Sequence, residues 1–349
     1  MALFIGGARK PPGEAAAEQG CGSIGVGYPS GIRACMAGDA QSRAVFRHFS
    51  LRNMKPLSIR FRGAFAWLAL LVHMAVVPAY AQDTLVRLHT SQGPIDFRLL
   101  DGEAPISVGN FLGYVRAGDY SDVFFHRSVR NFVVQGGGFR WAADSSTCCQ
   151  SVTSRGQIQN EFSAARSNVR GTVAMAKVGS NPNSATSQWF VNLADNSANL
   201  DNQNGGFTVF ARVTTPGMAV VDRIAALPTV DAGGVYAELP VAGWTPGTVI
   251  QRQNLALIER VTVLPPRAQQ TDADRIFDYL EAAYPQYLHP SQGAAGNADG
   301  YVYRYYSGSK AYVGVKDAKV WYLVPAINGD INPLGDVADW LASAQAAGY

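Results

Sequence analysis

The stretch FFHRSVRNFVVQGGGF, residues 124–139, places one histidine, two arginines, one glutamine and a glycine triplet among apolar residues. It contains no carboxylate pair, no cluster of metal ligands, and no serine or cysteine paired with a base. Its short apolar runs are separated by polar residues, a pattern typical of short strands. The stretch therefore predicts β-structure. It also raises the question of which chemistry uses an arginine and a glutamine set among phenylalanines and valines.

The flanking residues continue the strand pattern. TLVRLHT alternates, SQGP turns and IDFRLL continues, so residues 84–100 are predicted to form a hairpin. Short apolar runs recur later in the chain, separated by glycine, asparagine and serine: GTVAMA (171–176), QWFVNL (188–193), FTVFARV (207–213) and LALIERVTV (255–263).

Two segments break this pattern and predict helices. Residues 104–120 carry apolar side chains at helical spacing, with Pro105 suited to the first turn. The segment 216–227 is predicted to be a second helix, with Thr215 as its cap and Pro216 at its first position. About eight short strands with only two helices exclude a parallel α/β sheet, which needs a helix between most strands. The fold class is therefore mostly β, an antiparallel barrel or sandwich closed at its ends.

The composition changes near residue 266. Residues 266–273 are polar and predicted to be a linker after the barrel domain, 82–265. Residues 274–349 are predicted to form a small α+β domain, with strands at 301–306, 311–317 and 319–326 between two helices. Its tyrosines could form a sugar-binding or peptide-binding surface, but alternation of core and edge residues is the favoured interpretation.

The charge is unevenly distributed. Residues 1–81 carry nine Lys/Arg and three Asp/Glu, whereas the remaining residues carry 20 and 23. Because the larger part has no basic excess, we expect no nucleic-acid partner.

A signal peptide accounts for part of the early positive charge. Residues 54–81 contain a basic start, an apolar run from Ala64 to Val77 and a small-residue site at Ala79-Tyr80-Ala81. The run of about 14 residues is short for a membrane span, which needs roughly 20; a retained anchor is the alternative. We therefore expect export, with membrane contact only during passage.

Residues 1–53 precede this signal pattern and show no sustained apolar periodicity. We interpret them as an upstream extension outside the mature protein, with Met54 as the true start; a cytosolic N-terminal domain is the alternative. After cleavage the mature chain would keep two cysteines, Cys148 and Cys149. Their spacing fits no common zinc site, which leaves a loop pair, joined or free, or a redox switch.

The ordered set of motifs resembles one family. FHR, F-x-x-QGG, N-E, G-T-V-A-M-A, S-Q-x-F and V-F-A, found between residues 84 and 264, are similar to those of the cyclophilin-type peptidyl-prolyl cis-trans isomerases, closest to the exported bacterial members. The resemblance implies a closed eight-stranded antiparallel barrel capped by two helices, in the periplasm of a Gram-negative bacterium or secreted into the medium. It also implies acceleration of X–Pro bond rotation without a metal or cofactor, in proline-containing unfolded or partly folded polypeptides. Because no bond forms or breaks in that reaction, no nucleophile is needed, which answers the question of the opening stretch.

The resemblance implies roles for individual residues. Arg127 matches the arginine that donates a hydrogen bond to the prolyl nitrogen, and Gln135 matches the glutamine that holds the arginine and contacts the substrate backbone. Phe132 completes the catalytic set and, with Val133, Phe190 and Leu200, forms the apolar floor that receives the proline ring.

Further residues match the surroundings of that site. His126 matches a residue at the pocket edge that either contacts substrate or is structural, and Gln188 matches a residue beside the neighbouring groove. Ala176 and Lys177 match the segment whose backbone groups bind the residue before proline, and Asn160–Glu161 match a structural pair. The sequence departs from the family at Val133, often methionine, at Arg130-Asn131, usually Pro-Gly, and at Asn199, usually an aromatic residue. Loss of that ring is expected to weaken cyclosporin binding and could loosen substrate binding.

Three functions stay open at this point. The first is an exported, monomeric prolyl isomerase that assists protein folding. The second is a weakly active or inactive module that binds proline-containing segments. The third places the main role in residues 270–349.

Overall fold

The computed structural model describes residues 83–142, 148–325 and 329–349. The expected upstream extension and signal peptide, 1–53 and 54–81, lie outside the described residues. Within the described ranges, no helix combines the length and apolar character needed to cross a membrane.

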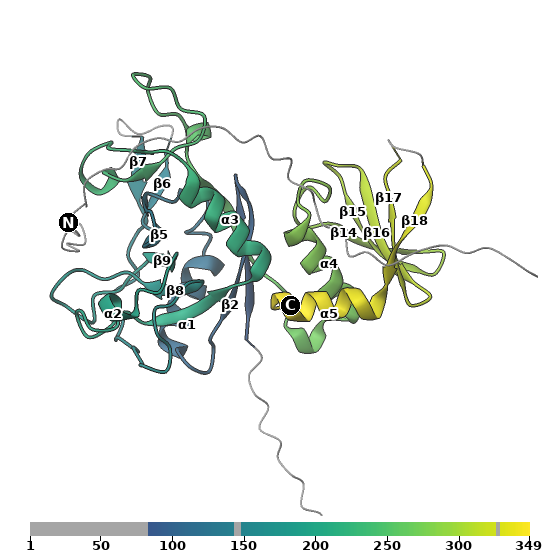
Figure 1. Ribbon diagram of the computed structural model, residues 1–349, viewed down its shortest axis with the longest axis horizontal. Helices are drawn as coiled ribbons and strands as arrows, with labels where there is room; N and C mark the ends of the chain where they lie inside the picture. The colour runs from purple at the N-terminus through teal and green to yellow at the C-terminus, as the bar shows by residue number, and fades with distance from the viewer. Residues whose placement is uncertain (1–82, 143–147, 326–328) are drawn as a thin grey trace, which may run out of the picture. The chain divides into compact units, whose positions relative to one another are not determined.

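Residues 83–263 are dominated by one antiparallel sheet (Figure 1). The neighbouring strands follow the order β4-β5-β9-β8-β10-β2-β1-β13-β3-β6-β7. The bounds are β1 Leu85–Thr90, β2 Gly93–Leu99, β3 Val123–Phe124, β4 Arg127–Val129, β5 Val133–Gly136, β6 Phe139–Trp141, β7 Cys149–Ser151, β8 Thr172–Met175, β9 Trp189–Asn192, β10 Val209–Val213 and β13 Leu257–Val263. A separate two-stranded sheet pairs β11, Thr229–Val230, with β12, Leu239–Pro240. The prediction of a mostly β fold is confirmed.

The predicted hairpin at residues 84–100 is present as β1 and β2. Leu88 pairs with Ile95, and Thr90 pairs with Gly93 across the turn. Because side chains alternate along a strand, Val86 and Leu88 point into the main core, where both are fully buried.

The helix predicted at residues 104–120 is α1, Pro105–Arg116. No side chain caps it from within its own segment. Instead, Glu161 accepts hydrogen bonds from the backbone N–H groups of Ile106 and Ser107, at 2.9 and 2.7 Å. Its neighbour Asn160 donates to the carbonyl of Gly205 at 2.7 Å. The N-E pair therefore binds the helix start and a distant loop, as expected of a structural pair.

The second predicted helix is α3, Thr215–Ala226. The prediction of Thr215 as its cap is wrong by one residue, because Thr214 occupies that position and Thr215 lies inside the helix. The Thr214 hydroxyl lies 3.4 Å from the Tyr349 hydroxyl and makes no capping bond.

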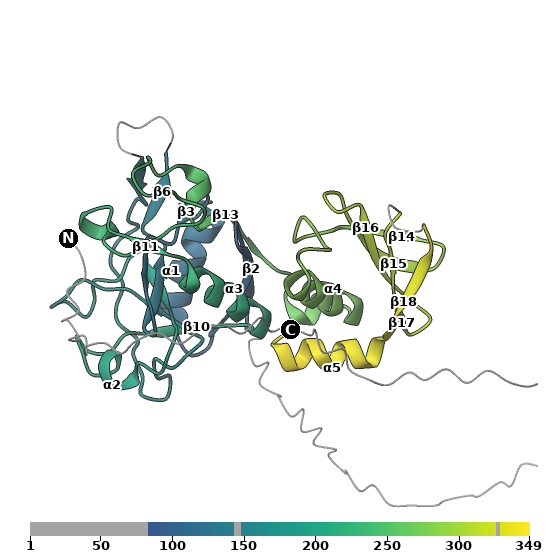
Figure 2. The same cartoon turned by 45° about the horizontal axis from the view of Figure 1, so that its top comes forward.

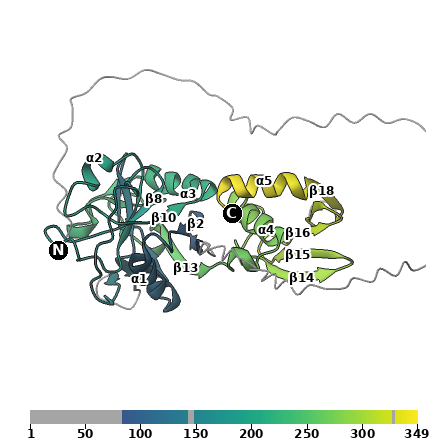
Figure 3. The same cartoon turned by 90° about the horizontal axis from the view of Figure 1, so that it is seen from below.

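Figure 3 shows α1 and α3 on opposite sides of β10 and β2. A short helix, α2, spans Ser197–Leu200, and short 3-10 helices span Gly234–Tyr236 (η1) and Arg252–Asn254 (η2).

The main core lies against one face of the curled sheet. Trp189 is its largest fully buried side chain. The indole lies edge-on to Phe97 and Phe125, with ring centroids 5.2 and 5.8 Å apart. Such edge-to-face arrangements are favoured by the charge distribution of aromatic rings.

The strands β6 and β7 carry the two mature cysteines. Cys148 and Cys149 form a disulfide in the structure, so the adjacent pair is joined rather than free. Cys149 begins β7 and packs beside a small apolar cluster that contains Phe124 and Leu239.

The C-terminal residues form a five-stranded antiparallel sheet packed against two helices (Figure 2). The helices are α4, Asp272–Ala283, and α5, Val337–Ala347; the strands are β14 Ala294–Ala298, β15 Tyr301–Tyr306, β16 Ala311–Lys316, β17 Lys319–Leu323 and β18 Ile331–Asp336. The predicted linker contains a 3-10 turn, Arg267–Gln269, and Thr271 with Asp274 caps α4 in a reciprocal capping box. Tyr306 is fully buried, whereas Tyr301, Tyr303 and Tyr305 are half-buried.

A fully buried ion network links the first hairpin to α4. Residues 83–349 belong to one compact unit, and Arg87 of β1 binds Asp96 of β2 through Nε and Nη2, at 2.8 and 2.7 Å. Its Nη1 donates to Glu281 of α4 at 2.5 Å, and Nη2 also donates to the carbonyl of Asp278 at 2.6 Å. The Tyr349 hydroxyl donates to Asp96 at 2.5 Å. Arg87, Asp96 and Glu281 have no exposed side-chain surface.

We therefore predict that Glu281→Ala lowers the free energy of unfolding by about 3 kcal/mol, because it leaves part of a buried guanidinium without its partner. Urea unfolding of the purified protein measures the loss. Lys319→Ala breaks a similarly direct but exposed pair with Asp336 and should change the free energy by less than about 0.5 kcal/mol. Equal effects of the two variants would contradict a buried network.

Candidate functional site

The predicted catalytic residues share one face of the sheet. Arg127 pairs with Gln135 across β4 and β5, and Gln135 pairs with Phe190 across β5 and β9. Because strand residues alternate, Val133 and Gln135 lie on this face, whereas Val134 between them is fully buried in the main core. One face of these strands thus builds the core, and the other carries the candidate site.

Two glycines after Gln135 allow this face to form. Gly137 has φ +79°, and a Cβ there would lie 2.5 Å from the carbonyl oxygen of Ser187. A Cβ on Gly138 would lie 2.8 Å from the side chain of Gln188. Glycine is therefore required at position 137, where the backbone of Ser187 approaches, whereas a Cβ at position 138 would displace the Gln188 side chain that binds Gln135.

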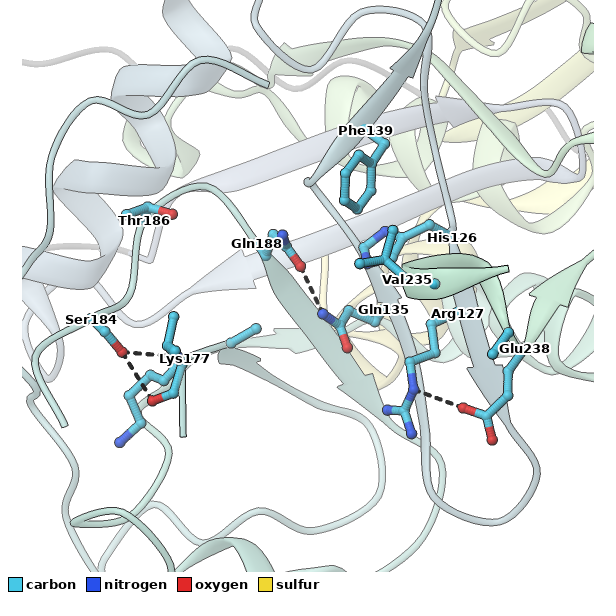
Figure 4. Close-up of a pocket in the computed structure, with 14 residues that line it drawn as sticks. His126, Arg127, Gln135, Phe139, Lys177, Ser184, Thr186, Gln188, Val235 and Glu238 are labelled. Carbon is cyan, nitrogen blue, oxygen red and sulfur yellow. Dashed lines mark hydrogen bonds and ion pairs between the residues drawn. The ribbon is translucent and has the colours of Figure 1, made fainter. Parts of the chain in front are cut away.

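A cavity of about 310 Å³ opens on this face (Figure 4). It is lined by His126, Arg127, Gln135, Phe139, Ala176, Lys177, Val178, Ser184, Thr186, Gln188, Gly234, Val235, Ala237 and Glu238. Six of the predicted site residues are among them: His126, Arg127, Gln135, Ala176, Lys177 and Gln188. Segments far apart in the sequence thus come together at the cavity.

The Arg127 guanidinium is bound on one side only. Its Nε lies 2.7 Å from Oε2 of Glu238, and the side chain is 22% exposed. Its Nη1 is buried and has no hydrogen-bond partner among the described residues. A buried N–H group without a partner is costly, so this group is suited to a substrate acceptor.

Gln135 binds a different neighbour from the expected one. Its Nε2 donates to Oε1 of Gln188 at 2.8 Å (Figure 4), and its Oε1 is buried without a partner within the described part of the chain. The expectation that Gln135 holds Arg127 is not met in this structure: Arg127 Nε is bound to Glu238, and Oε1 of Gln135, the atom that could accept from the guanidinium, has no partner within the described residues. The two unsatisfied atoms, Arg127 Nη1 and Gln135 Oε1, leave one donor and one acceptor at the site.

His126 is a buried, neutral residue. Its side chain lies edge-on to Phe139, with ring centroids 4.8 Å apart, and the residue is 2% exposed. Burial, and then the charge of Arg127, lowers the pKa of His126 to about 3. The imidazole therefore stays uncharged at neutral pH and lines the cavity without exchanging protons.

The depressed pKa of His126 has a consequence for stability. The unfolded chain binds a proton at His126 near pH 6.5, whereas the folded chain resists it until about pH 3, so stability falls as the pH drops between these values. From pH 7 to pH 5, we expect the parent to lose about 2 kcal/mol more unfolding free energy than His126→Asn, which has no proton to bind. Urea unfolding at the two pH values measures the difference. An equal loss in both proteins would contradict the buried neutral histidine.

The predicted apolar floor forms beside the cavity. Val133, Phe190 and Leu200 are buried in one cluster, and Phe132 packs against it partly exposed. The cluster also contains Phe207, whose ring lies edge-on to Phe190 at 5.8 Å. Sequence analysis missed Phe207 as part of this floor, although its place in the FTVFARV strand run was a usable signal.

The remaining predicted residues lie at the margins. The Ala176 amide donates to the Gln188 carbonyl at 2.9 Å. Lys177 Nζ donates to the carbonyls of Asn204 and Gly206, at 2.7 and 2.6 Å, and burial lowers the pKa of Lys177 to about 8. Its side chain thus fixes a loop, which leaves its backbone as the part able to meet a substrate. Asn199 lies half-buried on α2 and lines no part of the cavity.

The loop between β11 and β12 supplies residues that the sequence did not indicate. Val235, Ala237 and Glu238 line the cavity, yet this region shows no strong periodicity or motif. Among the described residues, no cluster of three or more His, Cys, Asp or Glu side chains could hold a metal ion.

Residues 85–245 match the family model described as cyclophilin type peptidyl-prolyl cis-trans isomerase/CLD. A peptidyl-prolyl cis-trans isomerase of Acinetobacter baylyi is 42% identical over 159 residues, which cover 45% of this chain and 80% of that protein. Peptidyl-prolyl cis-trans isomerase A of Dickeya dadantii is 42% identical over 170 residues, 48% of this chain and 84% of that one. Peptidyl-prolyl cis-trans isomerase B of Escherichia coli is 37% identical over 160 residues, 45% of this chain and 92% of that one.

Proposed function

The chain belongs to the cyclophilin-type peptidyl-prolyl cis-trans isomerases, and from this premise we propose that Arg127 is the group that accelerates X–Pro rotation. The observation that supports the proposal is the buried, unpartnered Nη1 of Arg127 at the cavity. Rotation about the peptide bond has a barrier of roughly 18–20 kcal/mol because the planar amide is stabilised by resonance. In the twisted transition state this resonance is lost, and the prolyl nitrogen regains a lone pair that can accept a hydrogen bond.

Arg127 can bind that lone pair more strongly than it binds either planar isomer. An interaction made only in the transition state raises the rate, and a preorganised donor needs little rearrangement when the lone pair forms. A 10⁵-fold acceleration requires about 7 kcal/mol. One donor in a water-poor site supplies about 3–4 kcal/mol, so binding of the twisted proline by the apolar floor must supply the rest.

The other residues have complementary roles. We assign the proline ring to the floor of Phe132, Val133, Phe190 and Leu200. The unsatisfied Oε1 of Gln135 is an acceptor for a substrate backbone N–H. His126 lines the cavity and stays uncharged at neutral pH.

Arg127→Ala should lower kcat/KM on an Ala-Pro peptide by a factor of 10² to 10³, the range found when one transition-state donor is removed. A protease-coupled assay measures the rate. Arg170→Ala is a matched control, because it breaks an arginine–carboxylate pair of 2.7 Å with Asp222 that lies outside the cavity; it should leave kcat/KM unchanged. An Arg127→Ala enzyme as fast as the parent would exclude the donor role.

We further propose that the sheet closes into an eight-stranded barrel with α1 and α3 over its ends. The supporting observation is that strands far apart in the sheet order share one core. Val134 of β5 and Ile258 of β13 lie in the same buried cluster, together with Phe111 of α1 and Val221 of α3.

We also propose that the enzyme acts on exported polypeptides. The support is the signal-peptide pattern of residues 54–81. Expression in a Gram-negative host, followed by mass spectrometry of the purified protein, should give a mature N-terminus at Gln82 in the periplasm or medium. A cytosolic product that retains Met54 or the residues before it would contradict export.

A further inference from the structure

Glu238 is the partner of Arg127 in this structure. It lies at the edge of the cavity directly before β12, and its Oε2 is 2.7 Å from Arg127 Nε. In Figure 4 the carboxylate approaches the guanidinium from the side opposite Gln135 and Gln188. The ion pair restrains rotation of the guanidinium about the side-chain torsions, because Nε is the guanidinium atom joined to the aliphatic part of the side chain.

The loop that carries Glu238 is itself held in place. The N–H of Ser128, next to Arg127, donates to the backbone carbonyl of Glu238 at 2.8 Å. The following residue, Leu239, is 4% exposed. Tyr236 lies edge-on to Phe139, with ring centroids 5.1 Å apart. The carboxylate is therefore attached to backbone that is bonded to β4 and packed on both sides.

We propose that Glu238 is a positioning residue for the isomerisation: it holds the Arg127 guanidinium in one orientation at the cavity, with the donor Nη1 left unpaired. The proposal rests on the proposed donor role of Arg127. Its physical basis is preorganisation. A free arginine side chain samples many rotamers, so fixing one of them in the transition state costs free energy. If the ion pair already holds the side chain in that rotamer before the substrate binds, this cost no longer adds to the barrier.

The Glu238 carboxylate could instead inhibit the reaction. If the carboxylate competed with the substrate for the guanidinium, removing the carboxylate would raise the rate. The structure argues against this, because Glu238 occupies Nε and leaves Nη1 without a partner among the described residues.

The test compares Glu238→Ala, Glu238→Gln and Arg127→Ala, alone and combined, in the protease-coupled assay on an Ala-Pro peptide. Glu238→Ala should lower kcat/KM about tenfold. Glu238→Gln should lose less, because its amide oxygen can still accept from Nε without the charge. Adding Glu238→Ala to Arg127→Ala should have no further effect, since a positioning residue acts only through its partner. The Kd of the peptide, from NMR titration, should change less than about twofold.

Two controls separate positioning from folding. Asp222→Ala removes the partner of Arg170 outside the cavity and should leave kcat/KM unchanged. Thermal unfolding shows whether each variant is folded, and Glu238→Gln keeps the size of the side chain if Glu238→Ala does not fold.

The outcomes distinguish this proposal from the function on which it rests. If Arg127→Ala is impaired but both Glu238 variants are as fast as the parent or faster, only the positioning role is overturned. The positioning role is also overturned if Glu238→Ala slows the enzyme equally with and without Arg127. If Arg127→Ala itself keeps full activity, the donor role fails first.

Discussion

The alternation of side chains along β5, β8 and β9 is the constraint on which the fold and the site both depend. Val134, Val173 and Val191 point into one core and are fully buried. Their neighbours Val133, Ala174 and Phe190 point the other way into the apolar floor. A shift of one residue in any of these strands would exchange the two sets. The same hydrophobic burial that specifies the strand register therefore also places Gln135 and the floor on the open face.

Charge is used differently at two places in the molecule. Between the first hairpin and α4, Arg87 is fully buried and all three of its side-chain nitrogens donate hydrogen bonds. At the cavity, Arg127 is partly exposed and bound by Glu238 at Nε, while Nη1 has no partner within the described residues. A buried guanidinium whose donors are all used has none left to bind a ligand. One with an unused donor beside a cavity can bind something that arrives from outside.

The sequence was sufficient for the parts of the fold that depend on local patterns. The hairpin of β1 and β2 followed from the alternation of apolar and polar residues around a turn, and α1 followed from helical spacing after Pro105. The strands β14 and β18 were missed, because AAGNA has no β-branched or aromatic residue, and INPLGD has only Ile331 and contains a proline. Their place in the sheet is determined by pairing with β15 and β17, which is a tertiary effect.

The candidate site also has a part that local sequence predicts and a part that only the folded chain determines. Arg127 and Gln135 could be predicted because they belong to a motif of fixed spacing within one stretch of chain. Their bonding partners could not. Glu238 is 111 positions beyond Arg127, on a loop with no strong pattern, and only the folded backbone brings its carboxylate to the guanidinium. The exchange of partners, in which Gln135 binds Gln188, depends on side-chain geometry that no spacing rule contains.

The central claim is that Arg127 acts on the transition state and hardly on the bound ground state. The most direct test is the rate of cis–trans exchange of an X–Pro peptide while bound, measured by NMR at saturating enzyme for the parent and Arg127→Ala. The account predicts that the variant binds the peptide with a similar Kd and exchanges it at least about 100-fold more slowly. An unchanged bound-state rate with a much weaker Kd would contradict it, because Arg127 would then contribute only to binding.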